Sequence, residues 1–148
     1  MLEQRTPEQC VELIWERLGC RVALPEETSD FFARRGRLRS AFAERRRFQR
    51  FHFPQKAILE RGGKYEAIYT KNLSRTGLMF LYAEQLFPCE EVRVFTSSGL
   101  CLPLVLCRCL RLQERCYECG ARYSGEARGV MADEQFRALL ASNDGTPA

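Results

Sequence analysis

Eight arginines gather between residues 34 and 50, a stretch whose only acid is Glu44 and which holds no lysine. The planar guanidinium group grips a phosphate or the edge of a guanine through two parallel hydrogen bonds, as the compact ammonium of lysine does not. The run therefore predicts an anionic partner, although a solvated helix face or a linker has a similar composition. Arg46 and Arg50 are four residues apart, which places both side chains on one side of a helical turn or an extended chain.

A second polar run, Asn72-Leu73-Ser74-Arg75-Thr76-Gly77, lies between two predicted strands. Asn72 and Ser74 can point to one face, and Gly77 permits a backbone conformation or a close approach that other residues resist. Alone, such a run is typical of a turn. Combined with the arginines it indicates a guanine-bearing anion, because guanine offers O6 and N7 to a guanidinium group.

Short apolar segments separated by turn signals follow Phe53. The predicted strands cover 55–60, 64–71, 78–82, 92–96, 100–112 and 116–123, with Gly62-Gly63 and Ser98-Gly99 as turns. Because no helical pattern separates them, we expect a mainly β fold, a small antiparallel barrel or sandwich. Apolar residues at 136, 139 and 140 predict a closing helix over 133–142.

Residues 1–43 are predicted to form a helical extension and linker. Thr6 and Pro7 favour a helix start, and Gly19 favours its end. The helix carries an apolar stripe that includes Trp15, and a second helix, weakened by Gly36, leads into the arginines. The stripe could pack on this chain's own barrel or on a partner, and the pattern does not choose between them.

The order Arg46-x-x-x-Arg50 and then Asn72-x-Ser74-x-x-Gly77 resembles the paired motif of PilZ domains, RxxxR and (D/N)xSxxG. The resemblance covers residues 44–125, and we take 44–143 as the domain with its closing helix. It implies a six-stranded antiparallel β-barrel and a bacterial receptor for cyclic di-GMP, often bound as an intercalated dimer.

By this similarity, Arg46 and Arg50 clamp guanine and phosphate groups of the ligand. Asn72 and Ser74 hydrogen-bond it from the barrel surface, and Gly77 shapes the turn. Arg45 and Arg75 are expected as auxiliary contacts. Ligand phosphates would neutralise the arginines before the first strand, and this segment would then fold onto the barrel. That movement would reposition residues 6–45 and create a surface for a downstream protein partner. The sequence also leaves open whether the protein forms oligomers.

Two alternatives remain. The arginines could form a nucleic-acid patch, with Phe48, Phe51 and Phe53 as stacking platforms, but their alternation on entering a strand favours the barrel core. The chain could also be a PilZ-like protein-interaction module that does not bind the nucleotide, although both motifs are intact.

No enzyme chemistry is predicted. His52 is the only histidine, so no Ser-His-Asp set is available, and Cys116 has no activating base nearby in the sequence. The eight cysteines are expected to be free, and those from 101 to 119 to be buried in strands, rather than to bind zinc. We expect no cofactor, no membrane span and no export signal, and hence a cytoplasmic protein.

Overall fold

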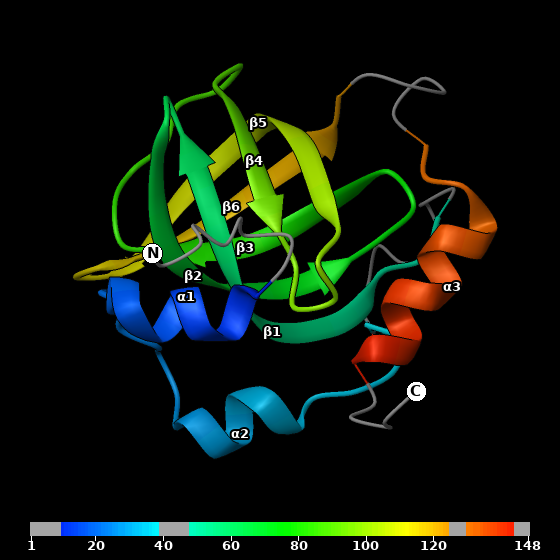
Figure 1. Cartoon of the computed structure of the whole chain (residues 1–148), viewed down its shortest axis with the longest axis horizontal. Coiled ribbons are helices and arrows are strands. Elements are labelled where there is room, and N and C mark those ends of the chain that lie inside the picture. Colours follow the sequence, from blue (N-terminus) through cyan, green and yellow to red (C-terminus); the bar gives the residue numbers. More distant parts are fainter. Residues whose placement is uncertain (1–9, 39–47, 125–129, 144–148) are drawn as a thin grey trace, which may run out of the picture.

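Six antiparallel strands form a closed barrel in the computed structural model, which describes residues 10–38, 48–124 and 130–143 (Figure 1). The strands follow one another around the barrel in the order β1-β2-β3-β6-β5-β4, and β4 returns to pair with β1. Their bounds are Phe51–Arg61 (β1), Lys64–Leu73 (β2), Gly77–Tyr82 (β3), Glu91–Phe95 (β4), Cys101–Gln113 (β5) and Cys116–Tyr123 (β6). The predicted fold class is therefore confirmed.

Alternation along the strands fills the barrel. Leu78, Phe80 and Tyr82 of β3 point inward and are at most 3% exposed. Inward residues of the other strands complete the same core, among them Leu104 and Ala121. The residues between them face outward, so Gly77 and its alternate neighbours on β3 lie on the outer surface.

The strand bounds differ from the sequence prediction mainly at the start of β1. Pro54 lacks a backbone N–H, yet it lies within β1, which begins at Phe51 rather than at the predicted residue 55. The register between β1 and β2 shifts between His52 and Gln55, and this irregularity accommodates the proline. Helix α3 spans Asp133–Ser142, as the apolar spacing predicts.

The two N-terminal helices, α1 (Val11–Leu18) and α2 (Thr28–Ala33), pack on the outside of the barrel (Figure 1). The indole of Trp15 is 8% exposed and donates its Nε1–H to the carbonyl oxygen of Ile68 at 2.8 Å. Phe31 of α2 joins the same cluster and meets the ring of Tyr69 edge-on at 5.6 Å. Of the two alternatives for the apolar stripe, packing on the chain's own barrel is the one observed.

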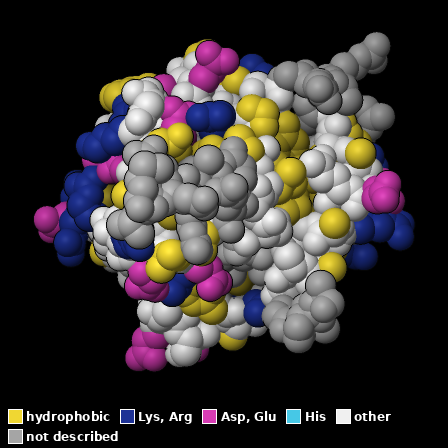
Figure 2. Space-filling model, viewed as in Figure 1, with side chains coloured by type: hydrophobic (Ala, Val, Ile, Leu, Met, Phe, Trp, Pro, Cys, Tyr) yellow, Lys and Arg dark blue, Asp and Glu magenta, His cyan; other side chains and the backbone are white. Residues whose placement is uncertain are grey.

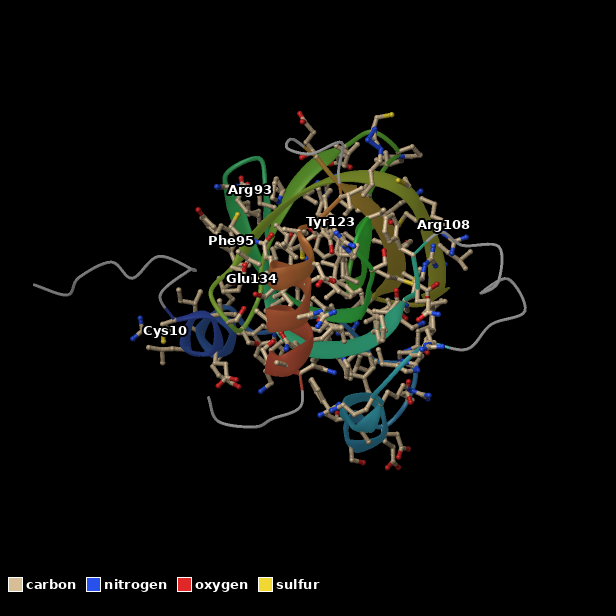
Figure 3. All side chains as sticks on the ribbon, turned by 90° about the vertical axis from the view of Figure 1, so that its right-hand side faces the viewer. Cys10, Arg93, Phe95, Arg108, Tyr123 and Glu134 are labelled. Carbon is tan, nitrogen blue, oxygen red and sulfur yellow. The ribbon has the colours of Figure 1, made fainter. Side chains whose placement is uncertain are left out.

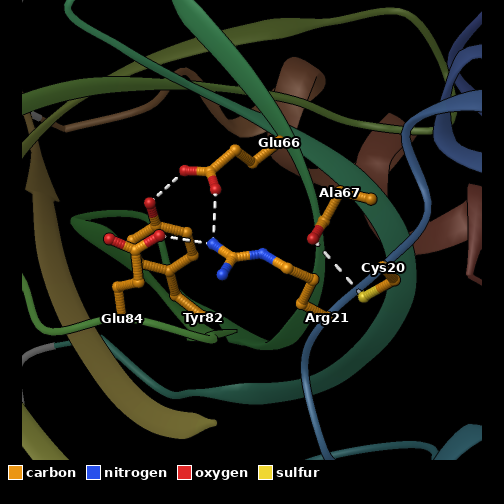
Figure 4. A network of polar contacts seen from close by, with 6 residues as sticks. All are labelled: Cys20, Arg21, Glu66, Ala67, Tyr82 and Glu84. Atoms are coloured by element: carbon orange, nitrogen blue, oxygen red, sulfur yellow. Dashed lines mark hydrogen bonds and ion pairs between the residues drawn. The ribbon is translucent and has the colours of Figure 1, made fainter.

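A polar network fastens the segment after α1 to the barrel (Figure 4). Arg21 donates hydrogen bonds to Glu66 and Glu84, and the Tyr82 hydroxyl donates to the other oxygen of Glu66. Nearby, the Cys20 thiol donates to the carbonyl oxygen of Ala67 at 3.4 Å. Gly19 ends α1 with a φ of 72°, as the sequence predicts, while the expected start at Thr6 lies outside the described residues.

The two ends of the arginine-rich segment meet at the start of β1. The Leu38 amide donates to the Arg50 carbonyl at 2.7 Å, and the His52 amide donates to the Gly36 carbonyl at 2.9 Å. Arg37 and Phe51 form an isolated antiparallel bridge between these bonds. Residues 39–49 therefore connect two points of the chain that are hydrogen-bonded to each other.

Helix α3 lies beside β1 at the edge of the barrel (Figure 1). Phe136 contacts Phe51 edge-on at 5.7 Å, and Phe53 is fully buried in the core, so the predicted core role is confirmed for Phe53. On the face shown in Figure 2, basic and acidic side chains are interspersed along the left edge, with apolar side chains exposed nearer the centre. Within the described residues, no helix is long and apolar enough to cross a membrane.

Candidate functional site

Arg50, from the arginine run, and four residues of the 72–77 run meet in a pocket on the outer face of β3, β5 and β6. We call it the motif pocket. Its volume is about 390 Å³. Arg50, Asn72, Ser74 and Gly77 line it. The remaining lining residues are Thr76, Leu78, Met79, Cys107, Arg108, Gly120, Ala121 and Arg122.

Asn72 is 4% exposed at the floor of the motif pocket. Its Nδ2 donates to the sulfur of Met79 at 3.4 Å. A thioether is a weak acceptor, so exchanging this contact for a stronger acceptor on a ligand would cost little. The register between β2 and β3 shifts between Thr70 and Asn72, and this irregularity accompanies the outward position of the amide.

Ser74 organises the turn between β2 and β3. Its Oγ accepts the Thr76 amide at 3.2 Å and contacts the Thr76 hydroxyl at 3.1 Å. The Ser74 amide donates to the Gly77 carbonyl at 3.0 Å. The Tyr123 hydroxyl donates to the Ser74 carbonyl at 2.8 Å, and burial raises the pKa of Tyr123, which keeps that donor protonated. The turn is thus fixed before any ligand arrives.

Gly77 is needed for a close approach between strands. A Cβ built on it would overlap the carbonyl oxygen of Ala121 and lie 3.2 Å from the carbonyl carbon. Gly77 pairs with Arg122 in the register of β3 and β6. The glycine therefore lets β6 lie against the end of the turn. The motif resemblance had implied a role for Gly77 in shaping the turn itself.

Three arginines, Arg50, Arg108 and Arg122, converge on the motif pocket. None of the described residues that line it is acidic. Figure 3 shows Arg108 on the outside of the barrel, on the side opposite α1, with Tyr123 inside. The pocket therefore presents positive charge beside the neutral donors and acceptors of Asn72 and Ser74, a combination suited to an anion that also carries polar uncharged edges.

Arg75 is engaged elsewhere. Its Nε donates to the Met131 carbonyl at 3.0 Å, and the Met131 amide donates back to the Arg75 carbonyl at 2.6 Å. The Arg75 guanidinium also lies 5.4 Å from the centre of the Phe48 ring. Arg75 is not among the residues that line the motif pocket. Arg45 and Arg46 lie outside the described residues.

The sequence matches the PilZ domain family over residues 44–139. The chain belongs to the PilZ domain family. Among solved structures, the inhibitor of motility MotI/DgrA of Bacillus subtilis is similar, with a TM-score of 0.49 and 14% identity. That alignment covers 68% of this chain and 50% of the other, so the chain spans half the length of that protein. No curated protein matches the sequence.

Two residues of the motif pocket, Arg108 and Arg122, were not predicted from the sequence as site residues. They lie on β5 and β6, and only the pairing of these strands brings them beside the motif residues. The sequence offers little signal for them, because Arg108 shares its strand with Arg111, and Arg122 shares its strand with Glu118.

His52 of the PilZ domain does not line the motif pocket. Its carbonyl accepts the Asn143 Nδ2 at 3.1 Å. Burial, and then the charges of Arg34 and Lys71, lower the pKa of the imidazole, so the neutral form is favoured at neutral pH.

All eight cysteines of the chain are free thiols. Within the described residues, no cluster of three or more His, Cys, Asp or Glu could hold a metal ion. Cys116 and Cys119 are buried as predicted, but Cys107 is exposed, which corrects the expectation of a buried thiol. The register of β5 and β6 shifts between Leu106 and Arg108, and this irregularity leaves Cys107 at the surface beside the pocket.

Proposed function

We propose that this PilZ domain is a receptor for cyclic di-GMP, which binds at the motif pocket through Arg50, Asn72 and Ser74 together with Arg46. The main observation in support is that Arg50 lines one pocket with Asn72, Ser74 and Gly77, although β1 and most of β2 separate Arg50 from them in the sequence. Its volume of about 390 Å³ falls within the range of roughly 300–1,000 Å³ typical of small-molecule sites.

The chemistry of the lining suits both parts of this ligand. Each guanine offers O6 and N7 as neighbouring acceptors for a guanidinium group, and each phosphodiester accepts from the remaining donors. Arg108 and Arg122 extend the basic surface along the pocket, in positions suited to the phosphates. Asn72 and Ser74 supply neutral hydrogen-bonding groups for the base edges.

An intercalated ligand dimer would carry four phosphates rather than two, and would call on more arginines. Arg45 and Arg46 would provide them from the segment before β1. Arg75 would provide another if it exchanged the Met131 carbonyl for a phosphate, a stronger acceptor for its charge. We assign Arg45 and Arg75 this auxiliary role.

Residues 39–49 are proposed to carry the signal of ligand binding to a downstream protein. Both ends of this segment are tied together at the start of β1, and α1 and α2 are packed on the barrel. Ligand phosphates would hold the arginines against the motif pocket and so change the surface that a downstream protein meets. The apolar stripe of α1 is occupied by the barrel, so the partner would contact this altered surface rather than the stripe.

Isothermal titration with cyclic di-GMP tests the assignment. Arg46→Ala, Arg50→Ala and Asn72→Ala are each expected to weaken binding by at least about tenfold, the cost of a lost charge-assisted or buried hydrogen bond. Arg17→Ala removes an exposed arginine of α1 and serves as the matched control with unchanged affinity. Undiminished affinity in both Arg46→Ala and Arg50→Ala would overturn the proposal.

A further inference from the structure

The sulfur atoms of Cys109 and Cys119 lie 3.6 Å apart in neighbouring strands. The two residues are direct partners in the antiparallel register of β5 and β6. Directly opposed residues in such a pair have Cα atoms about 4.5 or 5.5 Å apart, and both separations fall within the roughly 4.4–6.8 Å that a disulfide spans. The backbone therefore already satisfies the first requirement for a bond between them.

Both thiols also point to the same side of the sheet. Cys119 is part of the barrel core, and Cys109 packs against that core. Formation of a disulfide would bring the sulfurs to about 2.05 Å, a movement of roughly 1.5 Å from their present separation that side-chain rotation can supply. The second requirement, convergent side chains, is therefore met as well.

The two thiols differ in exposure. Cys119 is fully buried, and burial raises the pKa of its thiol. Cys109 is only half-buried, and its sulfur accepts the Leu86 amide at 3.5 Å. An oxidant from solution therefore meets Cys109 first, while Cys119 stands behind it as the second thiol.

We propose that Cys109 and Cys119 are a peroxide-sensitive pair that forms a reversible disulfide across β5 and β6. The Cys109 sulfur takes one oxygen of a hydroperoxide as the O–O bond breaks, which gives a sulfenic acid and releases water or an alcohol. The Cys119 sulfur then attacks the Cys109 sulfur, the S–O bond breaks, and the thiol proton leaves with the hydroxyl as water. The two electrons gained by the peroxide come from the two thiols, and a thiol reductant returns them.

The pair sits directly beneath the motif pocket. Arg108 precedes Cys109, Gly120 follows Cys119, and both line the pocket on the opposite face of the sheet. A Cβ built on Gly120 would lie 3.5 Å from the Arg108 Cγ, so the arginine side chain passes over the glycine. A disulfide would fix the backbone under that contact. Its formation depends only on the two thiols and not on the identity of the pocket's ligand.

Trypsin digestion without reductant tests the link after the full chain is treated with hydrogen peroxide and its free thiols are alkylated. Cleavage at the arginines separates residues 109–111 from residues 116–122. We expect these two peptides to be joined, with a mass two hydrogens below their sum, and to separate on reduction. The link should persist in Cys116→Ala and Cys107→Ser and be lost in Cys119→Ala.

Two results would overturn the proposal. One is a joined peptide that disappears in Cys116→Ala, and the other is Cys109 oxidised to sulfinic acid with no link to Cys119. A second measurement does not depend on any buried substitution. Closing the loop from 109 to 119 should raise the melting temperature of the oxidised protein by roughly 5–10 °C, and Cys109→Ser, at a half-buried site, should abolish that rise.

Discussion

Gly77 of β3 lies so close to β6 that a side chain on it would overlap the carbonyl oxygen of Ala121. The last residue of the predicted ligand motif is therefore also a packing residue of the barrel. The pairing of Gly77 with Arg122 places an arginine at the pocket, so the same close approach serves both the fold and the site.

Gly77→Ala is expected to lower the free energy of unfolding by about 1–3 kcal/mol, because the methyl group forces β3 and β6 apart. Gly120→Ala is the matched control in the neighbouring strand, where the nearest atom to a new Cβ is the Arg108 Cγ at 3.5 Å, an ordinary contact. Urea unfolding of both variants measures the difference. Equal stabilities would show that the two strands can separate at Gly77 without cost.

Trp15→Ala should lower the free energy of unfolding by about 3–5 kcal/mol, since it removes a buried indole and its hydrogen bond to Ile68. Leu18→Ala, at a site that is 39% exposed on the same helix, should cost far less. The measurement is thermal unfolding followed by circular dichroism. A Trp15→Ala protein as stable as the wild type would mean that α1 contributes nothing to the barrel.

Arg108→Ala and Arg122→Ala should each weaken cyclic di-GMP binding by about tenfold or more, because a charge-assisted hydrogen bond contributes about 1.5–3 kcal/mol. Arg111→Ala removes an exposed arginine from the same strand as Arg108 but away from the pocket. Titration calorimetry on all three variants separates a specific contact from loss of general positive charge. A similar loss in Arg111→Ala would contradict a specific role.

Most of the strands and α3 could be predicted from the sequence, because alternation and turn residues are local signals. The converging arginines could not, since Arg108 and Arg122 share one site only through the pairing of β5 with β6. The contact of Gly77 with Ala121 was equally hidden, because a glycine in a strand does not say which neighbouring backbone approaches it. The position of α1 was undecided, because an amphipathic stripe fits any apolar surface.

Stability should fall as the pH drops below about 6.5, through protonation of His52. The pKa of this imidazole is lowered in the folded chain, chiefly by burial, from the ordinary value of 6.5. Below pH 6.5 the unfolded chain therefore binds a proton at His52 more readily than the folded chain does. The contribution of His52 to the free energy of unfolding is fully present above pH 6.5 and is lost as the pH falls below it. Urea unfolding at pH 7.5 and 5.5 should show a smaller difference in His52→Gln than in the wild type. The same difference in both proteins would remove His52 as its source.

We propose that the motif pocket recognises a guanine dinucleotide rather than anions in general. Titrations of the full chain with cyclic di-GMP, cyclic di-AMP and GTP, side by side at two salt concentrations, test it most directly. We expect cyclic di-GMP to bind at least about tenfold more tightly than the other two. Adenine lacks the O6 acceptor that an arginine grips together with N7, and GTP offers one guanine where cyclic di-GMP offers two. Equal, weak binding of all three that falls steeply with salt would contradict it and indicate a general anion surface.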